Sequence, residues 1–272
     1  MISFPNAKIN IGLDVIEKRP DNFHNIDTVL YPVDIKDILE IIEAQDDNGS
    51  VRFTSSGLPI DADAGNNLCV EAYRLLCGDH NLPPVCIHLH KVIPVGAGLG
   101  GGSADAAFTI KMLNKLFSLN ITEQGMVEYA KRLGSDCAFF INNHPARATG
   151  RGDILEPVET DIAGYILVLV YPGIFISTAE AYSSVTPEKP QQLLKDLVMQ
   201  PLKQWKGTVH NSFETTIFTK YPELREIKEK LYGLGALYSS LSGSGSAVYG
   251  IFDKQVDTDK VFSGYKVWQT VI

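Results

Sequence analysis

The segment PVGAGLGGGSADAA, residues 94–107, most constrains what this chain can fold into, because it places five glycines within seven residues. Glycine inside regular structure costs about 0.5–1 kcal/mol relative to alanine, so this density indicates a backbone that must turn tightly or approach another group closely. Apolar residues then recur at helical spacing from Ala106 to Phe117 and predict a helix over residues 103–118. A glycine turn that opens a helix favours anions, because free N–H groups and the helix dipole point at the ligand.

The order of residues separates this loop from other phosphate-binding loops. A Walker A loop would have lysine before its serine, whereas Gly102 precedes Ser103 here. The dinucleotide pattern G-x-G-x-x-G is met from Gly96 to Gly101, but the acidic residue expected about 20 residues later at a strand end is Glu123, in a polar connection. A protein-kinase loop would need V-A-I-K, H-R-D and D-F-G further on, and the sequence has none of them.

Composition narrows the class of protein further. The chain has 272 residues, of which 44% are hydrophobic, enough for a sizeable core and two ordinary domains. Its net charge of −8 argues against general nucleic-acid binding, which needs a basic face. Its four cysteines lack C-x-x-C spacing, which favours a reduced, cytoplasmic protein over a zinc or redox site. Lys8 and Asp14 interrupt the N-terminal stretch, so we expect no signal peptide, and Pro172 breaks the longest apolar run, so we expect no membrane span.

Hydrophobic periodicity outlines the secondary structure. It predicts strands over residues 7–16, 37–44, 50–56, 83–93, 165–171 and 265–272. It predicts helices over residues 66–81, 103–118, 123–136 and 221–235, from Ser177 onward, and near 190–198 and 208–219. The elements mix without a strict strand–helix–strand rhythm, which predicts an α+β fold. Turn residues cluster around 150–164, so we expect two domains, residues 1–158 and 159–272.

The glycine segment resembles the P-x-x-x-G-L-G-S/G-S/G-S-A motif of the GHMP small-molecule kinases, in which the loop wraps the phosphates of ATP. The segment PNAKINIGLDV is similar to the first motif of that superfamily, and LSGSGSAVYGIF to the third, which packs against the nucleotide loop. The resemblance covers nearly the whole chain and implies a two-domain fold, with an N-terminal part like ribosomal protein S5 domain 2 and a ferredoxin-like C-terminal part. The ATP-binding residues that it implies are Pro94, Val95, Gly96, Ala97, Gly98, Leu99, Gly100, Gly101, Gly102, Ser103 and Ala104.

Three further segments resemble one family within that superfamily, the 4-diphosphocytidyl-2-C-methyl-D-erythritol kinases. KRPDNFHNIDTVLYPVDIKD is similar to their R-x-D-G-Y/F-H-x-I-x-T signature, LGSDCAFF to G-A/S-D-V/C-P-F-F, and NSFE to N-D-F/L-E. Two positions depart from these patterns: Asn22 stands where glycine is usual and Ala138 where proline is common. Asparagine tolerates positive φ better than most residues, so we expect the turn at Asn22 to survive.

The resemblance implies transfer of the γ-phosphate of ATP to the 2-hydroxyl of 4-diphosphocytidyl-2-C-methyl-D-erythritol, a step of non-mevalonate isoprenoid synthesis. Such transfer depends on positioning and charge stabilisation. The resemblance assigns the base to Asp136 and the catalytic cation to Lys8, whose charge would keep a neighbouring carboxylate ionised and stabilise the transferring group. Mg²⁺ is expected with the nucleotide phosphates, without a dedicated protein cage and with Ser103 as a protein contact.

The second substrate should place its cytosine among stacking rings and hydrogen-bonding groups. By resemblance, Phe23 and Tyr182 are the stacking residues, His24 bonds to cytosine, and Asn10 holds the erythritol hydroxyls. We interpret the alternating His88 and His90 as a solvated strand face, because no third metal ligand lies near them in the sequence.

Three other interpretations remain open at this point. They are a GHMP kinase for homoserine or mevalonate, a nucleotide-binding homologue without catalysis, and a Rossmann oxidoreductase. The first should lack RPDNFH, and the second would not need both Lys8 and Asp136. The partners expected are small molecules, not nucleic acid or membrane, the location expected is the bacterial cytoplasm, and the oligomeric state is left open.

Overall fold

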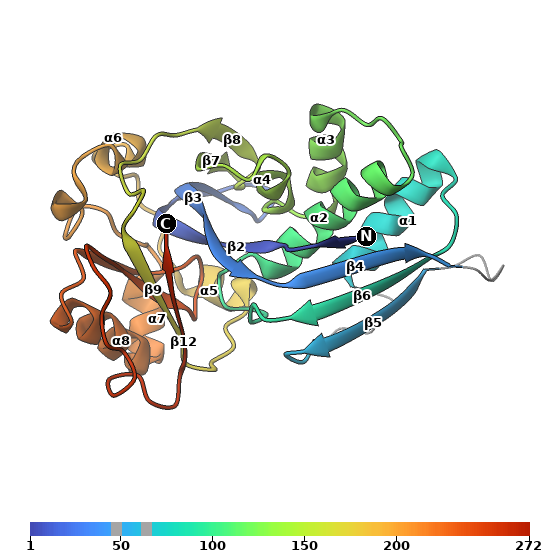
Figure 1. The fold of residues 1–272 in the computed structure, drawn as a ribbon. Coiled ribbons are helices and arrows are strands. Elements are labelled where there is room, and N and C mark those ends of the chain that lie inside the picture. Colours follow the sequence, from blue (N-terminus) through green and yellow to red (C-terminus); the bar gives the residue numbers. More distant parts are fainter. Residues whose placement is uncertain (45–50, 61–66) are drawn as a thin grey trace. The chain divides into compact units, whose positions relative to one another are not determined.

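The computed structural model describes residues 1–44, 51–60 and 67–272, which form two compact units (Figure 1). The first unit comprises Met1–Ala7, Ile35–Val95 and Gly100–His144, and the second comprises Lys8–Asp34, Gly96–Leu99 and Pro145–Ile272. Each unit therefore combines segments that are distant in the sequence. The predicted division at residue 158 cuts the chain only once, and it stays a prediction. Ser50 and Asn66, where two predicted elements begin, lie outside the described residues.

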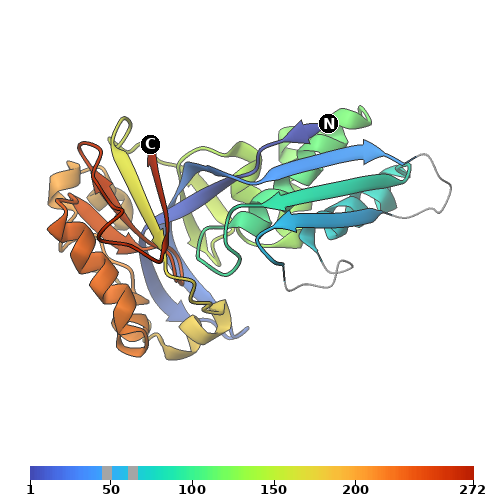
Figure 2. The same ribbon diagram turned by 60° about the horizontal axis from the view of Figure 1, so that its bottom comes forward.

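The first unit is a four-stranded sheet covered by helices on one face (Figures 1 and 2). Its sheet order is β1-β4-β6-β5, in which β5 runs parallel to β6 and the other neighbours are antiparallel. Its elements are β1 (Ile2–Ser3), β4 (Ile38–Glu43), β5 (Arg52–Gly57), β6 (Val85–Lys91), α1 (Leu68–His80), α2 (Gly101–Leu116), α3 (Glu123–Leu133) and α4 (Cys137–Asn142).

Strand β6 shows why this sheet has one covered and one solvated face. Its buried and less buried residues alternate without exception, as the period of two requires. His88 and His90 lie on the less buried side, where both rings hydrogen-bond to Ser56 of β5, at 3.0 and 2.9 Å. The predicted solvated face is therefore confirmed.

The second unit contains two four-stranded sheets. One has the order β2-β3-β7-β8, and the other, antiparallel throughout, has the order β10-β11-β9-β12. Their strands are β2 (Asn6–Lys18, which begins in the first unit), β3 (His24–Lys36, which ends there), β7 (Ala146–Gly150), β8 (Ile154–Pro157), β9 (Ile166–Tyr171), β10 (Tyr238–Leu241), β11 (Val248–Phe252) and β12 (Lys266–Val271).

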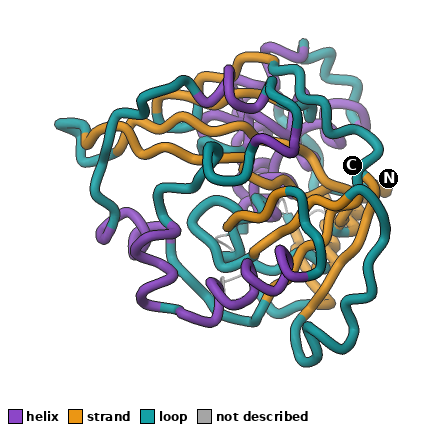
Figure 3. Tube along the Cα trace, turned by 90° about the vertical axis from the view of Figure 1, so that its left-hand side faces the viewer, coloured by secondary structure: helices purple, strands orange, loops and turns teal. Residues whose placement is uncertain are grey.

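The helices of the second unit are short, and much of the chain between them is loop (Figure 3). They are α5 (Thr178–Ser184), α6 (Leu194–Val198), the 3₁₀ helix η2 (Leu202–Gln204), α7 (Glu214–Lys220) and α8 (Pro222–Gly233). Helix α8 buries Leu224, Ile227 and Leu231, which join β9 and β11 in one apolar core. Predicted helix 208–219 is shortened to α7, because residues before it turn back to β2, where Ser212 N donates to Leu13 O at 2.8 Å.

None of the described helices is long and apolar enough to span a membrane.

Candidate functional site

The first unit presents a helix N-terminus that no side chain caps. Helix α2 begins at Gly101, two residues before the predicted start, and its N-cap residue is Gly100, which has a φ of 68° and makes no side-chain cap hydrogen bond. Ser103 therefore lies inside the first turn of the helix. Positive φ is the reason for glycine at position 100. The first-turn N–H groups thus remain available to an anion.

Beneath this helix start, the first unit buries an ion triad. Lys91 Nζ lies 2.5 Å from Asp37 Oδ2 and 2.8 Å from Asp105 Oδ2, and all three side chains are at most 3% exposed. Burial alone would lower the pKa of Lys91, but the Asp105 and Asp37 carboxylates raise it instead and keep the ammonium charged. Burial raises the pKa of Asp105 to about 7 against the opposing effect of Lys91.

Asp136 lies in the connection between α3 and α4. The sequence predicted Asp136 near the end of a helix. In the structure that helix, α3, ends at Leu133, and Asp136 is the N-cap residue of the next helix, α4. Its carboxylate makes no side-chain cap hydrogen bond, and it is half-buried. The Cys137 N–H donates instead to Gly134 O at 3.1 Å. The Asp136 carboxylate is thus not used to cap the helix that follows it.

In the second unit, Lys8 and Asn10 lie on one face of β2 next to the glycine segment. Both are 4% exposed, and Lys8 Nζ donates to Asn10 Oδ1 at 2.6 Å and to Gly98 O at 3.1 Å. Asn10 Nδ2 donates to Thr28 Oγ1 at 3.0 Å, so the amide is held from the neighbouring strand β3. A buried ammonium in a fixed position can stabilise negative charge more strongly than one in water.

The second glycine turn packs directly against Gly98, as the resemblance implied. Ser242 Oγ donates to Gly98 O at 2.8 Å, and a Cβ on Gly98 would lie 1.9 Å from Ser242 O. Gly98 also has a φ of 76°, which side chains rarely adopt. Ala247 N donates to Ala97 O at 3.1 Å. Close contact of the two glycine-rich turns therefore requires glycine at position 98.

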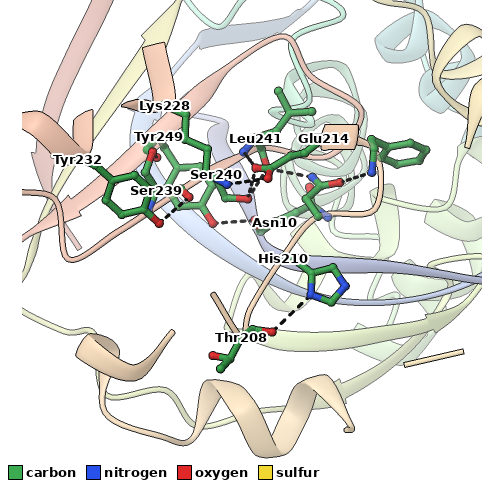
Figure 4. Close-up of polar contacts among 12 residues, drawn as sticks. Asn10, Thr208, His210, Glu214, Lys228, Tyr232, Ser239, Ser240, Leu241 and Tyr249 are labelled. Carbon is green, nitrogen blue, oxygen red and sulfur yellow. Dashed lines mark hydrogen bonds and ion pairs between the residues drawn. The ribbon is translucent and has the colours of Figure 1, made fainter. Parts of the chain in front are cut away.

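The NSFE segment supports that second turn, a role that we did not predict (Figure 4). Asn211 Nδ2 donates to Leu241 O and Gly243 O at 3.0 and 2.8 Å. Glu214 Oε1 accepts from Leu241 N at 2.9 Å, and its other oxygen pairs with Lys228 at 2.6 Å. Residues 211–214 and 241–243 are too far apart in the sequence for spacing to reveal this contact. The likeness of NSFE to a family motif was the one signal present.

Two predicted substrate residues of the second unit, His24 and Tyr182, stack on each other, while Phe23 contacts a different side chain. The His24 and Tyr182 rings are stacked with centroids 4.9 Å apart, and Tyr182 meets Phe213 edge-on. Burial, with Lys18 nearby, lowers the pKa of His24, and a neutral imidazole offers one donor and one acceptor. Phe23 is 54% exposed, and the Arg151 guanidinium lies over its ring, with the guanidinium carbon 4.8 Å from the ring centroid.

The Asn22 turn before these rings adopts the predicted conformation. Asn22 has a φ of 65°, in the left-handed region. Asn22 N donates to Arg19 O at 3.1 Å, and Arg19 N donates to Phe23 O at 2.8 Å, so the turn closes on itself. The departure from glycine is tolerated for the predicted reason.

His210 and Asp14 form an ion pair in the second unit, with Nε2 and Oδ1 3.1 Å apart. The hydrogen bond to Asp14 raises the pKa of His210 against the opposing effect of burial. Protonated His210 therefore stabilises the fold below its unfolded pKa of about 6.5, and this contribution is lost as pH rises through the higher folded pKa.

We expect the folded pKa of His210, measured by NMR titration, to lie above that of an unfolded peptide. Asp14→Asn should move it back toward the ordinary value, because the asparagine carries no charge. The melting temperature of the wild type should exceed that of Asp14→Asn more at pH 6 than at pH 8, where His210 is less protonated. Equal His210 titration curves in the two proteins would contradict the ion pair.

Among the described residues, no group of three or more histidine, cysteine or acidic side chains could hold a metal ion. Mg²⁺ prefers oxygen ligands, keeps several waters and commonly shares nucleotide phosphates. The Ser103 hydroxyl, in the first turn of α2, is a ligand of that chemical type. The donor set thus fits a magnesium ion that arrives with a nucleotide.

Family models match both halves of the chain. The GHMP kinases N terminal domain matches residues 67–146, and the GHMP kinases C terminal domain matches residues 193–266.

Curated relatives match over nearly the full length. A 4-diphosphocytidyl-2-C-methyl-D-erythritol kinase of Bacteroides fragilis is 48% identical over 96% of this chain and 95% of its own. One of Azobacteroides pseudotrichonymphae is 50% identical over 93% and 94%. A solved structure of a 4-(cytidine 5'-diphospho)-2C-methyl-D-erythritol kinase aligns with a TM-score of 0.80 and 28% identity, covering 99% of this chain and 98% of that one. The predicted two-domain α+β fold is confirmed.

Proposed function

The chain belongs to the GHMP kinases, and within them to the 4-diphosphocytidyl-2-C-methyl-D-erythritol kinases, and from this premise we propose how its residues divide the work of phosphoryl transfer. The enzyme transfers the γ-phosphate of ATP to the 2-hydroxyl of 4-diphosphocytidyl-2-C-methyl-D-erythritol in the non-mevalonate synthesis of isoprenoid precursors. The homoserine and mevalonate alternatives are not favoured, because relatives of 48–50% identity are named for the cytidyl substrate.

The glycine segment, Pro94–Ala104, binds the triphosphate of ATP. The observation that carries this assignment is the uncapped N-terminus of α2 behind Gly100. Its first-turn amides and the helix dipole stabilise anionic oxygens without any lysine in the loop. Gly102, exposed in that first turn, leaves the backbone open to approach. Mg²⁺ bound with the nucleotide would neutralise phosphate charge, with Ser103 as a protein ligand.

Asp136 accepts the proton of the substrate hydroxyl as that oxygen attacks phosphorus. Asp136 is the residue to which the family motif assigns the base, and it lies half-buried at the start of α4. Lys8 stabilises negative charge on the transferring group, and its contacts with Asn10 and Gly98 hold the ammonium in one place. A fixed charge contributes more than a mobile one, because the site need not reorganise during the reaction.

The cytidyl end of the substrate binds at His24, with Tyr182 and Phe23 as stacking partners. Since the His24 and Tyr182 rings already stack at 4.9 Å, cytosine packs against the outside of this pair or displaces one ring. Asn10 binds the erythritol hydroxyls. Its amide is well placed for this role, because Thr28 and Lys8 fix its orientation.

The partners of the chain are ATP and the cytidyl substrate. We place the enzyme in the bacterial cytoplasm, since its four cysteines are free thiols and the relatives named above are bacterial.

A coupled assay with three acceptors tests the activity. ADP release measured with purified protein, ATP and Mg²⁺ should be rapid with the cytidyl substrate and at background with homoserine or mevalonate. Turnover of either rival acceptor without the cytidyl substrate would assign the chain to another GHMP kinase. ATP binding with no turnover of any acceptor would support a catalytically silent homologue.

A further inference from the structure

Asp37, Lys91 and Asp105 bring three charged side chains together beneath the start of α2, although none belongs to the proposed catalytic set. Moving an ion out of water costs several kcal/mol, and a hydrophobic replacement of a buried ion pair is often as stable or more so. Asp105 Oδ1 finds no hydrogen-bond partner among the described residues, so this triad is not fully satisfied. Stability of the fold is thus a poor explanation for these charges.

Asp37 binds the two residues that connect strand β6 to the glycine segment. Its Oδ1 accepts from Val92 N at 2.6 Å and from Ile93 N at 2.9 Å, the two residues that follow β6. Its own N–H donates to Pro5 O at 2.9 Å, next to the start of β2. A carboxylate with two backbone N–H groups and one ammonium is firmly oriented. Asp37 therefore fixes where the glycine segment begins.

The ion pair of Lys91 and Asp105 holds helix α2, which begins within the glycine segment, against strand β6. Asp105 is the fifth residue of α2, and its bond to Lys91 joins this helix to the end of β6. Lys91 Nζ also lies directly under the helix start, 3.2 Å from where a Cβ of Gly101 would be. That Cβ would lie 2.9 Å from Ile93 Cγ2. The helix thus rests on the triad and on Ile93 with no space for a side chain.

We propose that Asp37, Lys91 and Asp105 are positioning residues for the nucleotide. Their contacts fix the residues just before the glycine segment and the helix that begins within it. The first-turn amides of α2 are thereby held in the orientation that binds the triphosphate. The inference rests on the proposed function, in which those amides bind ATP. The triad itself need not touch ATP. A displacement of about 1 Å in such a scaffold can cost about 100-fold in activity.

Two variants test the proposal through nucleotide affinity. The single variant Asp105→Asn keeps the size of the side chain and an oxygen that can accept from Lys91. The double variant Lys91→Met/Asp105→Asn removes the ion pair, while Asp37 keeps the two backbone N–H groups that donate to it. We expect the Kd of ATP, from titration calorimetry, to rise about threefold or more in the first and about 10- to 100-fold in the second. The KM of the cytidyl substrate should stay within about twofold, since that site lies elsewhere in the proposed scheme.

Lys111→Met is the matched control. Lys111 lies on the same helix, is partly buried, and donates to Ile141 O at 3.1 Å, so its loss removes a comparable contact away from the glycine segment. The control should bind ATP as the wild type does. Circular dichroism identifies which variants are folded, and if the double variant is not, Asp105→Asn alone decides.

Each result separates the two ideas. Folded triad variants that bind ATP with wild-type affinity would overturn the positioning role. Tighter ATP binding by Asp105→Asn would overturn it too, since the carboxylate would then act only by repelling phosphate. Gly102→Val reports on the proposed function instead, because Gly102 is exposed and a Cβ there would meet only Leu68 Cδ1, at 3.7 Å, and no residue of the triad. If Gly102→Val and the wild type bind ATP equally, ATP does not use the α2 N-terminus. If Gly102→Val loses ATP while the triad variants retain it, only the further inference fails.

Discussion

Asp136→Asn is expected to lower the kcat of the kinase by about 10²- to 10⁴-fold, the contribution typical of general base catalysis. Asparagine has nearly the same shape but cannot accept the hydroxyl proton at neutral pH. The fold should be retained, because the Asp136 carboxylate does not cap α4. The Kd of ATP should stay within about twofold, since the proposed nucleotide contacts come from the glycine segment. Single-turnover kinetics with the cytidyl substrate measures the chemical step directly.

Asp79→Asn provides the comparison for this experiment. Asp79 is exposed at the end of α1, where it accepts from Tyr129 Oη at 2.8 Å and lies 3.9 Å from Arg132. Its replacement changes the net charge of the same unit by the same amount without touching the proposed site. A kcat of Asp136→Asn equal to that of Asp79→Asn would remove Asp136 from the role of base.

Gly98→Ala is expected to abolish measurable ATP binding and to lower stability by several kcal/mol. A left-handed backbone costs an alanine about 1–2 kcal/mol. The added Cβ would also lie 1.9 Å from Ser242 O, so one of the two glycine turns must shift. Gly98 O moves with it, which loosens the Lys8 ammonium and the Ser242 hydroxyl that it accepts from. Nucleotide titration and urea unfolding measure the two effects.

Gly173→Ala separates backbone strain from steric contact. Gly173 has a φ of 84° in the same unit, but a Cβ there meets nothing within 4 Å. Gly173→Ala should therefore be destabilised only by backbone strain, by about 1–2 kcal/mol, and should keep the ATP affinity of the wild type. Equal stability losses for Gly98→Ala and Gly173→Ala, with ATP binding intact in both, would show that the contact of the two glycine turns is dispensable.

Local patterns predicted most of the regular elements and failed where the residue types show no pattern. Strand β2 was predicted from its alternating apolar and polar residues, although residues 6–15 are buried throughout, and helix α1 from apolar residues at helical spacing. Strand β3 was missed because residues 26–30 do not alternate: the polar Asp27 and Thr28 are adjacent, and so are the apolar Val29 and Leu30. Helix α4 has six residues, of which Cys137–Ile141 are all buried, so neither length nor period could separate it from a strand.

The candidate site divides in the same way. The loop and the residues aligned with family motifs were named in advance, and Asn22 took the positive φ that its place in the turn required. The supporting contacts were not foreseen. Glu214 meets the backbone of Leu241, and Asp37 meets Lys91, across 27 and 54 residues of chain. Spacing carries no information at such separations, because side-chain periodicity extends only within one helix or strand.

The sequence by itself determined that a dense run of glycines opens a helix and offers bare amides to an anion, since glycine freedom and helix geometry act over a few neighbouring residues. Only the tertiary structure decided that Gly98 must be glycine because Ser242 O lies against it, and that the ends of the segment rest on buried charges from β6, α2 and the residue before β4. These contacts depend on strand pairing and on how helices cover a sheet, which bring together residues that no local rule connects.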